Sequence, residues 1–257
     1  MKQLFTPLGI DHLIIACKNS LLRSNQLALL GFRQVGDYDA YFGRALGCGN
    51  TRIFLVDSKT KRFTKSLVSN FIHKHGDMQV MEVSIRVDSI RHVAEEMRQW
   101  SESQQLTTRN YHEDTFGNCV TVDFVFLYRQ AFQYSFTQRL DKFIPGIDHV
   151  AIAVDSLDQY VQLYKDFGFH VVYAPRKKKG LIQGERSAMR TYALRRGGLT
   201  VALVQGVDQK DTSQVTMYVR QHGNHSLHHA ALLTTHLSKM VASYLANGIG
   251  FRLYRVP

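Results

Sequence analysis

The sequence predicts an α+β fold in which tandem βαβββ modules form two curved, open-barrel domains, with the last module incomplete. Three observations support this prediction: the chain repeats its own landmarks, each repeat alternates strand and helix patterns, and the length suits two domains. The 257 residues are 44% hydrophobic and 21% charged, as in a globular protein with a real core. We expect one domain over residues 1–128, a linker over residues 129–145 and a second domain over residues 146–257.

The repeat is visible in landmarks that keep their order and spacing. The sequence GIDH at residues 9–12 recurs at residues 146–149, and Gly31-Phe32 recurs at the same offset of 137 as Gly168-Phe169. His75-Gly76 recurs at an offset of 147 as His222-Gly223. The ten-residue difference falls where the second copy carries a basic loop at residues 176–184. Matched landmarks in matched order indicate an internal duplication.

The second copy shows the elements most clearly. Residues 147–154 alternate like a half-buried strand, and residues 156–168 carry apolar side chains at helical spacing, with Ser156 as the cap and Gly168 at the end. Residues 170–174, 189–194 and 199–204 indicate three strands, the last two joined by a turn at Gly197-Gly198. A helix at 214–221, a strand at 227–233 and a helix at 237–246 follow.

The first copy shows matching pieces. We expect a strand over residues 80–87, a helix over 90–100 and a strand over 119–128, after which residues 129–145 indicate the linker. On the helix, Glu95 and Glu96 lie near Arg91 and Arg98 and indicate a solvated face.

The net positive charge of the chain indicates that its ligand is an anion. The chain has a net charge of +11 and a pI near 9.6, but only residues 176–179 form a compact basic block. Spread charge favours a small anionic substrate over nucleic acid as the partner. The apolar runs are too short for a membrane span, the N-terminus lacks a secretory pattern, and the three cysteines form no paired motif. We therefore expect a cytoplasmic protein without a membrane partner. Assembly into a homo-oligomer is left open.

Four stretches of the second copy stand out: GIDHVAIAV at 146–154, DFGF at 166–169, SAM at 187–189 and HHAALLT at 228–234. Together they resemble the vicinal oxygen chelate (glyoxalase/bleomycin resistance/dioxygenase) superfamily. The resemblance is closest to the 4-hydroxyphenylpyruvate dioxygenase type, which belongs to aromatic amino acid catabolism. It implies a non-haem Fe(II)-dependent dioxygenase acting on an aryl 2-oxo acid. The alternative is a non-catalytic, small-molecule-binding member of the same superfamily.

The resemblance also implies site residues. It makes His149 and His229 metal ligands for Fe(II), and it places Ser187 near the substrate. Strand alternation agrees, because His149 shares a face with Ala151, and His229 shares a face with Ala231. The same alternation predicts that His228 faces away from the metal and that His225 is a loop residue.

The chain departs from the family at two points. The family's third ligand, a glutamate on the eighth strand, would follow the helix at 237–246, and the sequence ends at Pro257. We therefore expect weak metal binding, in either a fragment or a short relative. In addition, Ala202-Leu203-Val204 stands where the family carries Pro-X-Asn, so the loss of the asparagine argues against 4-hydroxyphenylpyruvate itself.

The first copy offers an alternative site. His12 matches His149, Glu82 falls on His229 at the offset of 147, and Asp123 is the carboxylate on the later strand. Histidine and carboxylate groups are legitimate iron or zinc ligands. We expect a vestigial site here, because the rest of that strand is mostly apolar.

Overall fold

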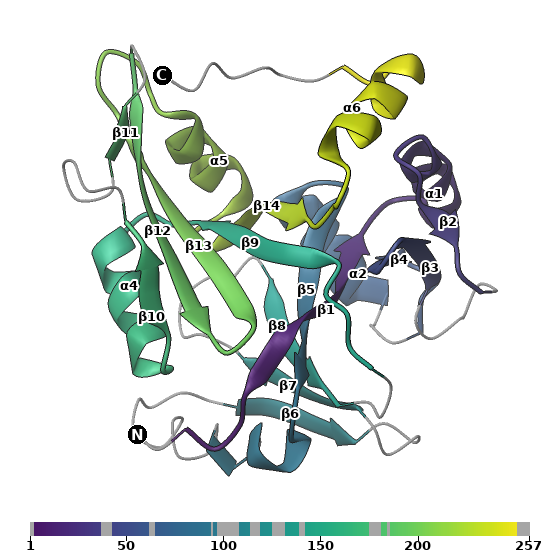
Figure 1. Ribbon diagram of the computed structural model, residues 1–257, viewed down its shortest axis with the longest axis horizontal. Coiled ribbons are helices and arrows are strands. Elements are labelled where there is room, and N and C mark those ends of the chain that lie inside the picture. Colours follow the sequence, from purple (N-terminus) through teal and green to yellow (C-terminus); the bar gives the residue numbers. More distant parts are fainter. Residues whose placement is uncertain are drawn as a thin grey trace.

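The computed structural model describes residues 3–36, 43–61, 65–93, 95–96, 108–113, 119–124, 132–138, 142–174, 181–183 and 186–250. The strands within these residues join into one curved, open, 14-stranded sheet that runs through both halves of the chain (Figure 1). This architecture confirms the predicted α+β fold of βαβββ modules. No helix within the described ranges combines the length and hydropathy needed to cross a membrane.

The described strands of the first half are arranged around β1. They follow the order β2-β3-β4-β1-β5-β8-β7-β6. The elements are β1 (Pro7–Ala16), α1 (Ser20–Ala28), β2 (Arg33–Gln34), β3 (Arg44–Cys48), β4 (Thr51–Val56), α2 (Lys65–His75), β5 (Gln79–Val87), β6 (Thr108–Glu113), β7 (Cys119–Phe124) and β8 (Gln133–Thr137).

The second half repeats this arrangement around β9, in the strand order β10-β12-β13-β9-β14. The elements are β9 (Ile147–Ala153), α4 (Leu157–Asp166), β10 (His170–Tyr173), β11 (Leu181–Gln183), β12 (Ala188–Arg196), β13 (Leu199–Val207), α5 (Gln214–His222), β14 (Ser226–Leu232) and α6 (Leu237–Ala246). Ser213 caps α5 by accepting a hydrogen bond from the backbone of Val215, whereas Ser156 precedes α4 without a side-chain capping bond.

Equivalent residues of the two halves meet each other directly. Ile10 of β1 pairs antiparallel with Ile147 of β9, which is its counterpart at the offset of 137. The Nδ1 of His75 lies 2.5 Å from the carbonyl oxygen of His222, and the Nδ1 of His222 lies 2.6 Å from that of His75. Reciprocal contacts between counterparts define a local two-fold axis between the halves. They also show that the repeated landmarks mark equivalent places in the fold.

Two helices of the second half cover opposite faces of its sheet. Along a strand successive side chains alternate between faces, and Leu203 packs with the α4 residue Leu157 while Val204 packs with the α5 residue Val215. In Figure 1 α4 and α5 accordingly lie on different sides of β12 and β13. The larger core includes residues of both halves and lies on the α4 side.

The predicted linker is wrong in its first part. Strand β8, Gln133–Thr137, lies inside residues 129–145 and pairs in parallel with β5. Its sequence, QYSFT, alternates polar and apolar residues, and Tyr134, Ser135 and Phe136 are all buried, so both faces of the strand are covered. Residues 142–145 have no regular structure, and the division into two domains stays a prediction.

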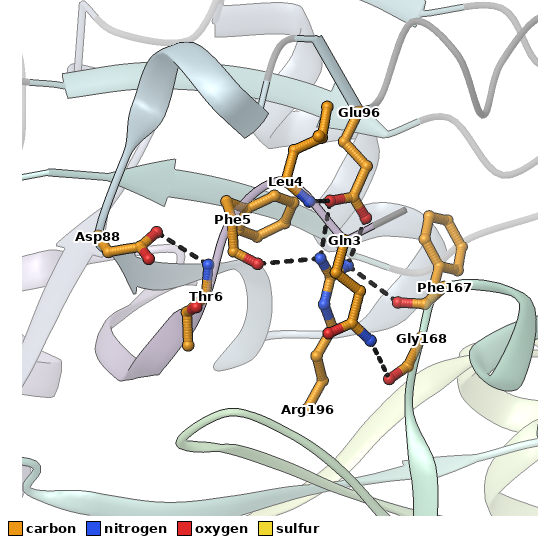
Figure 2. Close-up of polar contacts among 9 residues, drawn as sticks. All are labelled: Gln3, Leu4, Phe5, Thr6, Asp88, Glu96, Phe167, Gly168 and Arg196. Atoms are coloured by element: carbon orange, nitrogen blue, oxygen red, sulfur yellow. Dashed lines mark hydrogen bonds and ion pairs between the residues drawn. The ribbon is translucent and has the colours of Figure 1, made fainter. Parts of the chain in front are cut away.

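The expected solvated face is also wrong at Glu96, which is only 3% exposed. Its carboxylate receives hydrogen bonds from the guanidinium of Arg196, at 2.8 Å, and from the backbone nitrogen of Leu4, also at 2.8 Å (Figure 2). Arg196 further donates to the carbonyl oxygens of Phe5 and Phe167. The buried ion pair of Glu96 and Arg196 thus binds the backbone of the N-terminal segment and joins it to both halves of the chain.

Candidate metal centre

Three strands of the second half bring His149 and His229 onto one face of the sheet. His149 of β9 pairs with Thr200 of β13. Two residues along β9, Ala151 pairs with Ala202 of β13 and with His229 of β14. Residues paired across neighbouring strands point to the same face. The two predicted histidines therefore share a face with small side chains, which we call the histidine face.

The two imidazoles lie close together on the histidine face. Their ring centroids are 5.9 Å apart with ring planes at 73°. Two imidazoles that bind one metal through nitrogen at about 2.1 Å have their centroids roughly 4.5–5.5 Å apart, so the rings here are slightly more separated than in a bound pair. The Nδ1 of His149 donates to the carboxylate of Asp148 at 2.7 Å, which leaves Nε2 with a lone pair. A carboxylate behind the distal nitrogen is the usual support of a metal-binding histidine.

The prediction for His228 is wrong. A β-bulge falls between Leu227 and His229, so alternation breaks at that point and Leu227 pairs with Ile152 on the opposite face. As a result the Nδ1 atoms of His228 and His229 are 2.9 Å apart, and one ring donates to the other. The surrounding protein desolvates His229, and together with the neighbouring imidazoles of His228 and His149 this lowers its pKa to about 4. The neutral imidazole that a metal requires is therefore the favoured form at neutral pH.

The donor set is incomplete within the described part of the chain. No group of three or more His, Cys, Asp or Glu side chains there could hold a metal ion. His149 and His229 thus fit the two histidine positions of a two-histidine, one-carboxylate site, and the described residues supply no carboxylate for the third position. Ligand-binding roles for His149 and His229 stay a prediction.

Ser187, the predicted substrate residue, precedes β12 at a distance from the histidines. Residues paired across neighbouring strands form a row, and the row of His229 runs through Ala151 and Ala202 to Ala193 of β12. Six residues of extended strand separate Ser187 from this row, which corresponds to roughly 20 Å along the strand. Its contact with substrate is untested by this geometry and stays a prediction.

Two hydroxyl groups were missed by the sequence reasoning. The side-chain oxygens of Thr191 and Ser226 are buried and have no hydrogen-bond partner within the described residues. Thr191 pairs with Val204, and Ser226 pairs with Ala153, so both belong to the next row of the histidine face. No sequence signal marks them, because their position depends on the register of four strands.

The alternative site in the first half is filled. His12 is buried, is paired with Asp11 at 2.8 Å and packs against the ring of Phe54. Glu82 is buried and accepts a hydrogen bond from Ser135 at 2.6 Å. Register confirms that Glu82 occupies the place of His229, since each pairs with the same position of the central strand. The side chain of Asp123 lies outside the described residues.

The two halves differ most in the row that holds His229. Where the first half pairs Ile14 with Phe54, the second half pairs Ala151 with Ala202. Ile14 lies in a small apolar core, with Phe54 packed against it. Beside His229, the paired residues Ala151 and Ala202 of the second half carry methyl groups only, and Ala202 is partly exposed. The first half is thus packed where the second half has small side chains.

A family comparison agrees with this geometry. Residues 148–253 match the family described as Glyoxalase/Bleomycin resistance protein/Dioxygenase superfamily. The second half is a domain of this superfamily. The match begins one residue before His149 and includes His229. A search of curated proteins found no matching sequence.

Solved structures share the fold of the chain at low identity. A mutant of 4-hydroxymandelate synthase from Streptomyces coelicolor has a TM-score of 0.70 and 17% identity, over 94% of this chain and 76% of that protein. The 2,2',3-trihydroxybiphenyl 1,2-dioxygenase of Sphingomonas wittichii strain RW1 has a TM-score of 0.59 and 13% identity, over 96% and 80%. Homoprotocatechuate 2,3-dioxygenase from Arthrobacter globiformis has a TM-score of 0.59 and 14% identity, over 95% and 70%.

Proposed function

We propose that this chain is a non-haem Fe(II)-dependent dioxygenase for an aryl 2-oxo acid, of the 4-hydroxyphenylpyruvate dioxygenase type, with His149 and His229 as two metal ligands. The observation that carries the proposal is the convergence of these imidazoles on an alanine-rich face, within the superfamily domain. The shared fold with 4-hydroxymandelate synthase and two ring-cleaving dioxygenases supports the reaction class.

The residues at and beside the histidine face would have different roles in the reaction. Asp148 holds the tautomer of His149 that leaves Nε2 as a ligand. Ala151 and Ala202 place only methyl groups beside the histidines, and the unpartnered hydroxyl of Thr191 would orient a polar substituent of the substrate. Fe(II) bound there would supply adjacent positions for a chelating 2-oxo acid and for dioxygen.

Charge on the same face suits an anionic substrate. Arg195 pairs with Thr200, in the row of His149, and its guanidinium donates to the hydroxyl of Thr200 at 3.0 Å. A cation at the edge of the site would attract a carboxylate, as would the net charge of +11. We propose a small anionic compound as the partner, and neither nucleic acid nor membrane.

The rival function is non-catalytic binding of a small molecule. It is favoured by the incomplete donor set within the described residues. A 2-oxo acid adds two oxygen ligands, so we expect weak Fe(II) binding that tightens when the oxo acid is present. Binding without turnover would support the rival.

The test is an anaerobic calorimetric titration of Fe(II), with and without phenylpyruvate or 4-hydroxyphenylpyruvate, followed by measurement of oxygen uptake. His149→Ala and His229→Ala should each weaken Fe(II) binding at least about tenfold, whereas the exposed His73→Ala should not. The pair Ala151→Ile and Ala202→Phe, which copies the first half, should abolish binding of the oxo acid while the protein stays folded. Fe(II) affinity unchanged in both histidine variants would refute the proposed site.

A further inference from the structure

A second site of a different kind lies where the two halves meet. A pocket there holds about 410 Å³ of empty space, open solvent included. Its walls come from the N-terminal segment and the start of β1, from β5, β8 and α4, from the residues that follow α4, and from the adjacent ends of β12 and β13.

The pocket is separate from the histidine face. Leu199 lines the pocket, whereas its neighbour Thr200 pairs with His149. Successive side chains of a strand point to opposite faces, so the sheet lies between the two sites. Leu199 also belongs to the core on the α4 side.

The accessible wall of the pocket consists of carbon atoms. Two tyrosines contribute their rings, because their hydroxyl groups are engaged elsewhere. The hydroxyl oxygens of Tyr134 and Tyr164 are 2.6 Å apart, and that of Tyr164 lies 3.1 Å from Nε2 of His225. The guanidinium of Arg196 is likewise bound to Glu96. The Nε of Arg196 has no hydrogen-bond partner among the described residues, but it is buried beneath the wall. The wall thus offers no accessible polar atom to a charged ligand, and a neutral apolar ligand needs none.

The arrangement of the aromatic side chains favours a flat ring as the occupant. Phe5 and Phe136 lie edge to face, with centroids 5.5 Å apart and planes at 82°. Tyr164 and Phe169 lie edge to face at 5.2 Å and 80°. Walls at right angles offer both a face and an edge to an inserted ring, which are the preferred aromatic geometries.

The wall is held in place before any ligand enters. Figure 2 shows the N-terminal segment on both sides of Phe5: Leu4 donates to Glu96, and Thr6 donates to Asp88 at 2.8 Å. The carbonyl of Phe5 accepts from Arg196 at 3.1 Å, and the guanidinium carbon of Arg196 lies 4.2 Å from the centroid of the Phe5 ring. A preformed wall lowers the entropic cost of binding.

We propose that this junction pocket binds a neutral, single-ring aromatic compound. The probe for a test is fluorobenzene, titrated into the full chain and followed by fluorine NMR. We expect saturable binding with a dissociation constant of about 0.1–1 mM, a range within reach of a seven-atom ligand. The carboxylate analogue 4-fluorobenzoate should bind at least about tenfold more weakly, because the wall exposes no polar atom to its carboxylate.

Substitutions at one position separate the pocket from the rest of the protein. Leu199→Phe should fill the pocket and weaken fluorobenzene binding at least about tenfold, whereas Leu199→Ala should enlarge it and admit 1-fluoronaphthalene. His149→Ala and His229→Ala should leave fluorobenzene binding unchanged, so that this test is independent of the proposed dioxygenase. Absence of saturable binding, equal affinity for 4-fluorobenzoate, or loss of binding in His149→Ala would each overturn the proposal.

Discussion

The ion pair between Arg196 and Glu96 should stabilise the fold far more than a surface pair does. Their side chains are 3% and 4% exposed, so Arg196→Leu would leave the carboxylate of Glu96 in the interior without its cation. Stranding one member of a buried pair costs about 3–5 kcal/mol. The carbonyl oxygens of Phe5 and Phe167 also lose a donor each. We therefore expect a loss of at least about 4 kcal/mol in unfolding free energy, or a fall in melting temperature of about 8–15 °C for a chain of this length.

The assay is urea unfolding at pH 7 followed by far-ultraviolet circular dichroism. A matched control is Arg190→Leu, which breaks the pair with Asp158, whose side chain is 76% exposed. That variant should lose no more than about 1 kcal/mol. The double variant Arg196→Leu with Glu96→Leu should be more stable than Arg196→Leu alone, because no buried charge remains. An Arg196→Leu protein within about 1 kcal/mol of the wild type, or a double variant less stable than the single one, would refute this reasoning.

Three further predictions concern single residues. Gly146→Ala should destabilise the fold strongly, because its added Cβ would lie 2.3 Å from the backbone at Asn50 and Thr51. Gly250→Ala is the control and should have little effect, since its Cβ meets nothing within 4 Å. The melting temperatures of the two variants test this prediction. Burial lowers the pKa of His225 to about 3, so the folded protein binds fewer protons than the unfolded chain between pH 6.5 and pH 3, and stability falls as the pH falls through that window. Asparagine tolerates the φ of 55° at this position, so His225→Asn should fold. In this variant the unfolding free energy should fall less steeply with decreasing pH, by up to about 1.4 kcal/mol per pH unit, as measured by urea unfolding. An unchanged pH dependence of the unfolding free energy would contradict this prediction. Burial raises the pKa of Cys17 to about 12, so iodoacetamide should label Cys17 in urea but not in the native protein, as read by mass spectrometry.

The duplication made most of the fold predictable. The helix at 237–246 has the bounds of α6, and the expected strand at 227–233 is β14 displaced by one residue. Equivalent glycines even share their backbone angles: Gly31 and Gly168 have φ of 80° and 79°, and Gly76 and Gly223 have φ of 95° and 94°. Left-handed glycines at the ends of helices are local signals, so sequence alone can reveal them.

Pairing between distant segments set the limits of the sequence reasoning. The bulge at His228 depends on the register of β14 against β9, which no local pattern encodes. Glu96 resembles a solvated helix residue until Arg196, one hundred positions away, folds against it. Strand β8 was missed because its five residues lie in a stretch whose polar residues and proline indicated a linker, and its place in the sheet depends on pairing with β5 and β7.

The pairing of Ile10 with Ile147 has a bearing on the order of folding. Within each half the central strand finds its partners at shorter range: Leu13 pairs with Ile53, and Val150 pairs with Val201. Contacts between nearer residues form at a lower loop-closure cost, so each half should assemble before the two dock. The junction pocket then comes into existence only at docking, and a ring bound in it would report the last step of folding. Fluorobenzene should accordingly slow unfolding in proportion to its occupancy and leave the earlier folding phases unchanged.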